Sequence, residues 1–550
     1  MSMFDEMKEL TKKLVAVPSM NGTSGERDIA DAIEAYLREI PYFKAHPELV
    51  ITQDLKDDPL HRRNVMALLK GGDGTERDTI MLHGHIDTVD VDDFGKYKKY
   101  KEFAFDCDKL AEAFREAELP EDARRDLESG DYLFGRGACD MKGGDAVFLV
   151  LARHLAEHVE KLHGNLLLSF NPVEETLHRG IIEELPVLRE LQKQHDLNFK
   201  LAINNDFICP MYAGDTTRYV YTGAVGKLLP MFYIIGRETH VAQCFEGFSP
   251  DLTAAELTRI IDRNPDFCDG YNGEYTLPPT VLKMQDLKPR YNVQTPHTAA
   301  VYFNYFVHNR QLTEIMALLK NAANTALENV MRAADERYRR YCDISGNQYS
   351  SLIEKTQVMD YRELYLCAGK AYEGDLDAFI VSVTDASIVE GDDMRITSLR
   401  IVQALSDLCG IKTPTVIVFF ATPFCPHNTL KKENAEEAAV IADLEKIAAE
   451  FEKESGEHMK LQQFFPSLTD SSYLKIDDDD ASGAMLKNCF PGYEKLYPVP
   501  LETAKALNIP AVNYGVWGKD CHKWTERIYM PYSFGKLPDF IEKTIHYYFD

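Results

Sequence analysis

The chain has 550 residues, of which 45% are hydrophobic and 11% aromatic, so it can bury one large core and a second domain. Its 61 basic and 88 acidic residues give a net charge of −27, which argues against nucleic acid or an anionic membrane as a partner. The 11 cysteines show no regular spacing, as expected for reduced thiols. Residues 1–14 lack the apolar core of a signal peptide, and no apolar run is long enough to span a bilayer. We therefore expect a soluble cytoplasmic protein.

Short apolar runs alternate with segments of helical apolar spacing over the first two hundred residues. This alternation predicts an α/β fold with a mostly parallel sheet covered by helices. The expected helices span residues 26–39 and 145–158, and the expected strands span residues 64–69, 79–82, 165–170 and 200–203.

The texture changes at residues 214–226, where three glycines bracket a polar and aromatic stretch, as at a hinge. The elements that follow have the order β-α-β-β-α, which predicts a small inserted α+β domain. They span residues 228–235, 251–262, 280–287, 298–307 and 312–339. A second break lies near residues 345–351, after which we expect helices at 392–408 and 434–454 and a strand at 414–421. We therefore predict a catalytic domain in two parts, residues 1–213 and 346–550, with a lid or dimerisation domain at residues 214–345.

Acidic and imidazole side chains follow the predicted strands, at the positions that a two-metal hydrolase would need. Loops at the carboxyl ends of parallel strands are where open α/β sheets carry their chemistry. The spacing is too long for a local finger-type metal site and fits a site assembled from many strand ends. The candidates are His85, Asp87, Asp140, Glu174, Glu175, Asp206 and His522.

Residue spacing assigns provisional roles to some of these candidates. His85 and Asp87 are two apart, so their side chains point the same way and Asp87 can hold the imidazole. Asp140 ends a glycine-rich turn before a helix, where it can be a metal ligand, a helix N-cap or both. Glu174 and Glu175 diverge, so one can bind metal while the other acts as general base. Solvated loop carboxylates are the alternative for this pair.

Histidines and cysteines near these positions have other readings. His83 lies on the same face as His85 and is expected to be a packed neighbour. His522 lies between the two tryptophans of the chain, and Glu526, four residues later, is a candidate for orienting its ring. Cys139 and Cys521 are the candidate nucleophiles for a cysteine-dependent reaction, but no positioned acid or base is implied beside Cys521.

Taken together, these stretches resemble the M20 family of metallopeptidases and amidohydrolases. The matching segments are Gly84-His85-Ile86-Asp87, Gly135 to Gly144, Glu174-Glu175, Asp206 and the late His522, with Val17-Pro18-Ser19 and Gly25-Glu26 near the N-terminus. Within the family the chain is most similar to the RocB-type arginine-utilisation group. Three segments carry that similarity: residues 221–230, residues 238–241, and Phe464-Phe465-Pro466 with Asp470. The resemblance covers nearly the whole chain.

The resemblance implies a cofactor of two divalent metal ions and a role for each candidate. His85 and Asp206 would bind one ion, and Glu175 and His522 the other. Asp140 would bridge the ions, Glu174 would take a proton from the shared water, and Asp87 would orient His85. Three carboxylates and two imidazoles suit Zn²⁺ and also accept Mn²⁺ or Co²⁺.

The resemblance also implies residues in the lid and a homodimer through it. His240 is similar to the family's lid histidine, which stabilises the oxyanion, and Asn292 to an asparagine that contacts substrate. Many members carry Asp-x-Arg on a lid strand, where the arginine binds a substrate carboxylate. Here the counterpart reads Asn304-Tyr305-Phe306, and Arg310 is the candidate replacement. Residues 90–135 form a longer stretch than is usual, with a charged helical segment at 108–128 that is either a surface elaboration or a border of the substrate entrance.

Three functional hypotheses follow. The first is a two-metal hydrolase of an amide or peptide bond in a small amino-acid derivative or short peptide, in arginine or amino-acid catabolism. The second is a non-catalytic metal- or ligand-binding protein on the same fold. The third is a cysteine-dependent hydrolase. Glu174 favours the first hypothesis, because a binding protein has no use for a general base beside a ligand glutamate.

Overall fold

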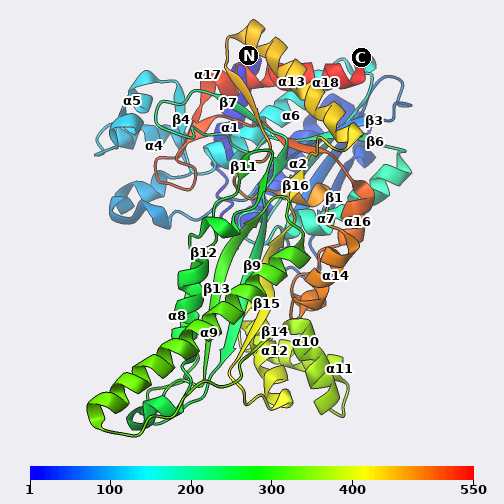
Figure 1. Ribbon diagram of the computed structural model, residues 1–550. Coiled ribbons are helices and arrows are strands. Elements are labelled where there is room, and N and C mark those ends of the chain that lie inside the picture. Colours follow the sequence, from blue (N-terminus) through cyan, green and yellow to red (C-terminus); the bar gives the residue numbers. More distant parts are fainter. The chain divides into compact units, whose positions relative to one another are not determined.

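The computed structural model describes residues 1–550, which form two compact units (Figure 1). The first unit comprises Met1–Val225, His427–Ile476 and Pro500–Asp550. The second comprises Gly226–Pro426 and Asp477–Val499. The chain therefore leaves the first unit and returns to it twice.

An eight-stranded mixed sheet forms the centre of the first unit. Four of its seven strand pairings are parallel, and β5, β3, β6 and β18 form a continuous parallel core. The strand order is β1 (Val50–Asp54), β2 (Arg63–Lys70), β5 (Asn165–Asn171), β3 (Asp78–His85), β6 (Asn198–Asn204), β18 (Ala511–Asn513), β7 (Arg218–Tyr221) and β17 (Met459–Gln462). The predicted α/β class is confirmed, and each expected strand overlaps an observed one, with ends that differ by no more than four residues.

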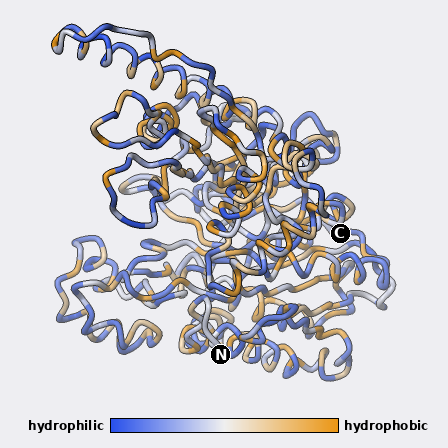
Figure 2. The backbone as a smooth tube through the Cα atoms, turned by 90° about the horizontal axis from the view of Figure 1, so that it is seen from below, coloured by the Kyte–Doolittle hydropathy of each residue, from blue (hydrophilic) through white to orange (hydrophobic).

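Helices cover the central strands, so that every residue of β5 is buried. This explains why the strands read as continuous apolar runs rather than alternating ones. α2 (Gly25–Glu39) and α7 (Arg179–Gln194) pack on β2, and α6 (Gly143–Ala156) packs on β3. Hydrophobic and hydrophilic residues alternate along the helical turns in Figure 2, as expected for helices that bury one face. The remaining large helices of this unit are α1 (Met3–Val15), α13 (Ala435–Ser455) and α18 (Leu537–Phe549).

Residues 90–135 form a helical layer with its own apolar cluster. It contains η2 (Asp92–Phe103), α4 (Cys107–Phe114) and α5 (Glu121–Ser129), and its core includes Phe94 and Phe114. The expectation of one charged helix at 108–128 was wrong. Pro120 disfavours helical backbone in the residue before it, and a new helix begins directly after it. A small sheet lies next to this layer. Its strands are β19 (Gly518–Lys519), β20 (Arg527–Tyr529) and β4 (Tyr132–Phe134).

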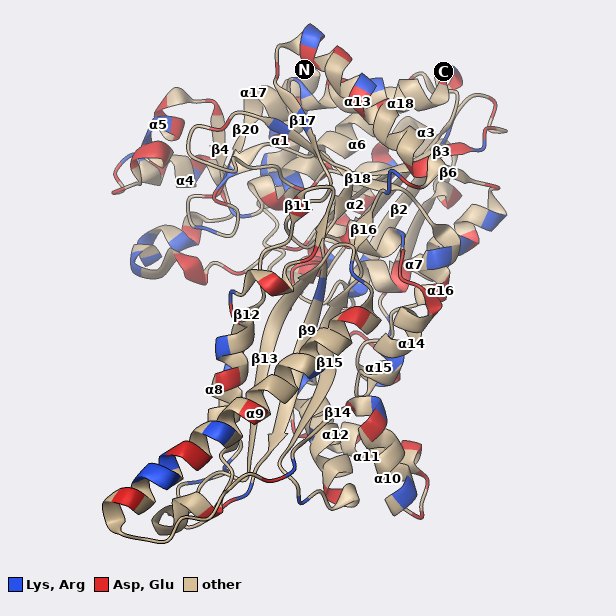
Figure 3. Ribbon diagram, in the orientation of Figure 1, with Lys and Arg blue, Asp and Glu red and all other residues tan.

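A five-stranded sheet with helices on both faces forms the second unit. The order is β12 (Thr280–Asp286), β13 (Thr298–Val307), β9 (Gly226–Ile235), β15 (Thr415–Cys425) and β14 (Gln357–Asp360). α8 (Pro250–Ile261) and α9 (Leu312–Ser345) pack on one face. α10 (Tyr361–Ala371), α11 (Leu376–Val389) and α12 (Met394–Cys409) share an apolar cluster with the other face. Figure 3 shows that charged residues are sparse on the strands and alternate in sign along the distal half of α9.

The limits of the two compact units differ from the expected domain limits of 214 and 345. The second unit continues to Pro426 because β15 is an inner strand of its sheet and pairs with β9 over most of their length. The apolar run at 414–421 gave no sign of which sheet it joins, since a buried strand reads alike in either. Residues 477–499 also belong to the second unit, through α14 (Asp480–Asn488) on α9.

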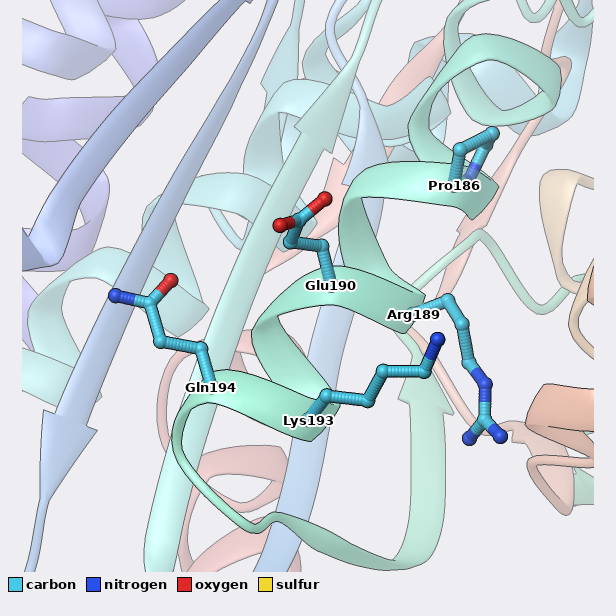
Figure 4. Close-up of a pocket in the computed structure, with 5 residues that line it drawn as sticks. All are labelled: Pro186, Arg189, Glu190, Lys193 and Gln194. Atoms are coloured by element: carbon cyan, nitrogen blue, oxygen red, sulfur yellow. The ribbon is translucent and has the colours of Figure 1, made fainter.

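None of the helices combines the length and apolar character that crossing a bilayer requires. A shallow pocket of about 410 Å³ lies along α7 and is lined by Pro186, Arg189, Glu190, Lys193 and Gln194 (Figure 4). These side chains come from successive turns of one helix, and none of them is a candidate site residue.

Candidate metal centre

Three adjacent parallel strands bring most of the candidate residues to one edge of the large sheet. β3 ends at His85, β5 ends three residues before Glu174, and β6 ends two residues before Asp206. β3 pairs in parallel with both β5 and β6, so their carboxyl ends lie side by side. The strand-end reasoning therefore accounts for the position of these loops.

Asp140 and His522 arrive by a different route. β4 leads into the turn that contains Asp140, and the β19–β20 hairpin carries His522 in its loop. β20 pairs with β4, which fixes the hairpin beside the Asp140 turn. His522 has a backbone φ of 65°, in the left-handed region that non-glycine residues seldom adopt.

The carboxylate of Asp140 lies between two imidazoles. Its Oδ1 is 3.0 Å from Nε2 of His85, and its Oδ2 is 3.0 Å from Nε2 of His522. The same His522 nitrogen lies 3.0 Å from Oε1 of Glu175. One ligand atom each from His85, Asp140 and Glu175 lie within 4.8 Å of one another. A carboxylate that divides its two oxygens in this way is suited to bridging two cations.

Glu174 is buried beside this chain of contacts without joining it. Its Oε2 lies 4.0 Å from Nε2 of His85, and the residue is 7% exposed. Burial raises the pKa of Glu174 well above its usual value, and the nearby His85 and His178 oppose that rise. A carboxylate with a raised pKa takes up a proton more readily than an ordinary one, which suits a general base.

Asp87 fixes the loop that carries both glutamates. Its Oδ1 accepts from the backbone N–H of Glu174 at 3.0 Å, and its Oδ2 accepts from that of Glu175 at 3.1 Å. Asn21 donates to the same Oδ2 at 2.9 Å. Nδ1 of His85 lies 3.1 Å from the Asp87 carbonyl and 3.7 Å from its carboxylate. Asp87 therefore contacts the His85 ring mainly through its main chain. Sequence analysis missed two features: the hydrogen bonds from the glutamate loop to Asp87, and the contact of Asn21 with the same carboxylate.

The raised pKa values of Asp206 and Glu175 indicate an excess of buried negative charge around them. Burial and the charge of Asp140 raise the pKa of Asp206 to about 8, and the same two causes raise the pKa of Glu175. Burial alone would lower the pKa of His522, but its hydrogen bonds to Asp140 and Glu175 raise it to about 11. Carboxylates that crowd around imidazoles in this way form a donor set that fits divalent cations.

Glu526 has a role that differs from the expected one. Instead of orienting His522, its Oε1 accepts from the backbone N–H groups of Cys139 at 3.1 Å and Asp140 at 3.2 Å. Its Oε2 accepts from Arg136 at 2.8 Å, and Arg136 also pairs with Asp93. The expectation failed because i, i+4 spacing applies to a helix, whereas this segment is a hairpin loop.

Glu526→Gln is expected to weaken metal binding roughly 10- to 100-fold. Mutation of a residue that hydrogen-bonds to a metal ligand typically lowers metal affinity by that factor. The matched control is Asp93→Asn, which removes the other partner of Arg136 without touching the Asp140 turn. Titration of the metal-free variants with Zn²⁺ measures the affinity. Equal affinity in Glu526→Gln and Asp93→Asn would show that Glu526 contributes only to stability.

Trp524 connects the hairpin to the helical layer of residues 90–135. Its ring stacks on Tyr97 with centroids 4.0 Å apart and packs edge-on against Phe114 at 5.4 Å. Residues 90–135, which the sequence left open as a surface elaboration or a border of the substrate entrance, thus support the loop that carries His522. Its sequence gave no signal of this, because stacking partners distant in the chain leave no periodic pattern.

The remaining histidine and cysteine expectations are resolved by burial. His83 is fully buried, and its Nε2 lies 3.2 Å from the Ser471 hydroxyl, as expected for a packed neighbour. Burial lowers the pKa of His83 to about 3. Burial also raises the pKa of both Cys139 and Cys521, so neither thiol ionises readily. A weakly ionised thiol is a poor nucleophile, which disfavours the cysteine hypothesis.

The lid candidates lie in the second unit, where two of them meet. His240 pairs with Gln294 in an isolated bridge, and Val241 donates to the carbonyl of Val293, so His240 lies beside the loop of Asn292. Both His240 and Asn292 are exposed. Arg310 lies elsewhere, after the end of β13, and its guanidinium is 3.4 Å from the hydroxyl of Tyr305.

Comparison with known proteins shows which family the chain belongs to. The model of the family described as peptidase family M20/M25/M40 matches residues 81–478. Protein RocB of Bacillus subtilis is 38% identical over 98% of this chain and 94% of its own length. The B. subtilis protein YqjN is 34% identical over 98% of this chain and 96% of its own. A tripeptidase structure from Staphylococcus aureus covers 99% of this chain and 98% of its own, with a TM-score of 0.52 and 14% identity, a likeness of fold.

Proposed function

Because the chain belongs to peptidase family M20/M25/M40, a family of hydrolases acting on C–N bonds, we propose that it cleaves an amide or peptide bond of a small amino-acid derivative or short peptide. The observation that carries this proposal is the Asp140 carboxylate, which divides its oxygens between His85 and His522. Glu174 is buried beside these contacts and takes no part in them. A free general base at this place supports catalysis over binding alone.

Five residues would hold two divalent ions. His85 and Asp206 would bind one ion, Glu175 and His522 the other, and Asp140 would bridge them. This donor set of three carboxylates and two imidazoles suits Zn²⁺ and would accept Mn²⁺ or Co²⁺. When bound, such ions lower the pKa of a shared water molecule and polarise a carbonyl group.

The protein's own residues would move the proton and orient the reactants. Glu174 takes a proton from the attacking water and delivers it to the leaving amine. Asp87 holds Glu174 and Glu175 in position, because its carboxylate accepts hydrogen bonds from their two backbone N–H groups. His240 stabilises the negative charge that develops on the carbonyl oxygen. Asn292 and Arg310 contact the substrate.

The lid strand β13 bears on how a substrate carboxylate would be bound. By resemblance to the family, Asn304, Tyr305 and Phe306 are the counterpart of the Asp-x-Arg that many members carry, so a substrate carboxylate would lack its usual partner there. Arg310, beside the Tyr305 hydroxyl, is the cation offered in its place. We therefore propose that Arg310 contacts the substrate carboxylate, whether the substrate is a short peptide, an acylated amino acid or a carbamoylated one.

The test is a hydrolysis screen on protein that has been stripped with a chelator and reloaded with Zn²⁺, Mn²⁺ or Co²⁺. Release of free amine is measured for N-acyl amino acids, carbamoyl amino acids and dipeptides. We expect one class to be hydrolysed with the metal and not with the chelator. Protein that binds two ions and hydrolyses none of these classes would instead support the non-catalytic binding protein.

A further inference from the structure

Glu174 has two fully buried partners on the side away from the metal ligands. Nδ1 of His178 lies 3.8 Å from Oε1 of Glu174 and 2.9 Å from Oδ1 of Asp470. His178 and Asp470 are each 1% exposed. The three side chains, at positions 174, 178 and 470, form a second compact group of potential ligand atoms. Sequence analysis selected neither His178 nor Asp470 as a site residue.

The local fold fixes His178 rather than leaving it on a mobile side chain. The backbone N–H groups of Leu177 and His178 both donate to the carbonyl of Val173, so the chain turns tightly around Glu174. His178 then precedes α7 with a φ of 51°, in the left-handed region. Tyr473 packs against its ring, with centroids 5.5 Å apart. Asp470 begins the short helix η7 (Asp470–Leu474) in the same unit.

The two oxygens of Glu174 face different imidazoles. Oε2 faces His85, on the metal-ligand side, at 4.0 Å, and Oε1 faces His178 at 3.8 Å. Rotation of the carboxylate would exchange these environments, so a fixed His178 sets which oxygen is presented to the reacting water. We propose that His178, itself held by Asp470, is a positioning residue that orients Glu174 for proton transfer. This inference rests on the proposed function of Glu174 as the general base.

Charge supports the same assignment. Glu175 and Asp470 both place negative charge near Glu174, whereas His85 and His178 act against the rise in its pKa that burial causes. Glu174 and Asp470 face the same nitrogen of His178, at 3.8 and 2.9 Å, so a protonated imidazole would offset the repulsion between the two buried carboxylates.

The kinetic test compares His178→Gln and Asp470→Asn with the wild-type enzyme on a substrate found by the screen. We expect kcat to fall roughly 10- to 100-fold in each, the usual range for residues that orient a reacting group, with KM and bound Zn²⁺ unchanged. Added to Glu174→Gln, either change should lower the residual rate no further, because each acts through Glu174. A further loss that multiplies the first would overturn the inference.

The matched control is Asp215→Asn, another change of a buried aspartate. Asp215 accepts hydrogen bonds from Met211, Thr217 and Tyr219 and contacts no candidate site residue. It should lower the melting temperature and leave kcat unchanged. A third equivalent of Zn²⁺ in the wild type that is lost in His178→Gln would also overturn the proposal, because the group would then be a metal site.

A second measurement needs no substrate. The melting temperatures of His178→Gln, Glu174→Gln and the double variant should be non-additive if the two side chains interact. Non-additivity in a protein that hydrolyses no amide would refute the proposed hydrolysis and still support the His178–Glu174 contact. Additive melting temperatures would overturn the positioning role whatever the wild type hydrolyses.

Discussion

Glu174→Gln is expected to lower kcat by roughly 10²- to 10⁴-fold, the contribution that general acid–base catalysis typically makes. Glutamine keeps the shape of the buried side chain but cannot accept the proton of the attacking water. Metal content should stay at the wild-type value, because Glu174 lies 4.0 Å from the nearest ligand imidazole and outside the Asp140 chain of contacts. Elemental analysis together with steady-state kinetics measures both quantities.

The matched control is the neighbouring Glu175→Gln, which should lose metal as well as turnover because Glu175 contacts His522 at 3.0 Å. Stability separates the two further. Burial raises the pKa of Glu174, so its ionised form destabilises the folded state once the pH exceeds the unfolded pKa, and glutamine removes that cost. The Glu174→Gln protein should therefore melt no lower than the wild type at neutral pH. Wild-type turnover in this variant would show that another group is the base.

Sequence patterns located the parts of the centre that depend on strand ends. His85, the glutamate pair and Asp206 follow buried apolar runs, and parallel pairing of β3 with β5 and β6 brings such ends together. The same reasoning worked for the lid elements, where β13 spans the expected residues and α9 begins at the expected one. In each case a local pattern determines the local structure.

Contacts between distant segments were out of reach. No periodicity links Glu526 to the Asp140 turn, and none links Trp524 to Tyr97. The assignment of β15 to the second unit depends on pairing with β9, which an apolar run does not specify. His178 offered one usable signal, its position four residues after Glu174, although that turn is not helical. Local sequence patterns therefore indicate candidate ligands at strand ends more readily than the residues that contact them from distant segments.

Asp140→Ala is expected to abolish both turnover and the binding of at least one of the two metal ions. Its two oxygens contact His85 and His522 separately, so the change removes a ligand from each side of the centre. Zn²⁺ affinity should fall by more than about 100-fold, beyond the range for residues that only hold a ligand. Elemental analysis after dialysis against a trace of Zn²⁺ gives the stoichiometry.

Two further variants decide what that loss means. Asp140→Asn keeps the shape and one carbonyl oxygen, so it should retain more Zn²⁺ than Asp140→Ala while still losing turnover. Asp215→Asn, a buried aspartate that contacts no candidate ligand, should keep the full metal content. Two ions retained in Asp140→Ala would mean that Asp140 does not bridge them. The remaining donors would then have to form two separate sites, and the short His522–Glu175 contact would be the place to search for the second ion.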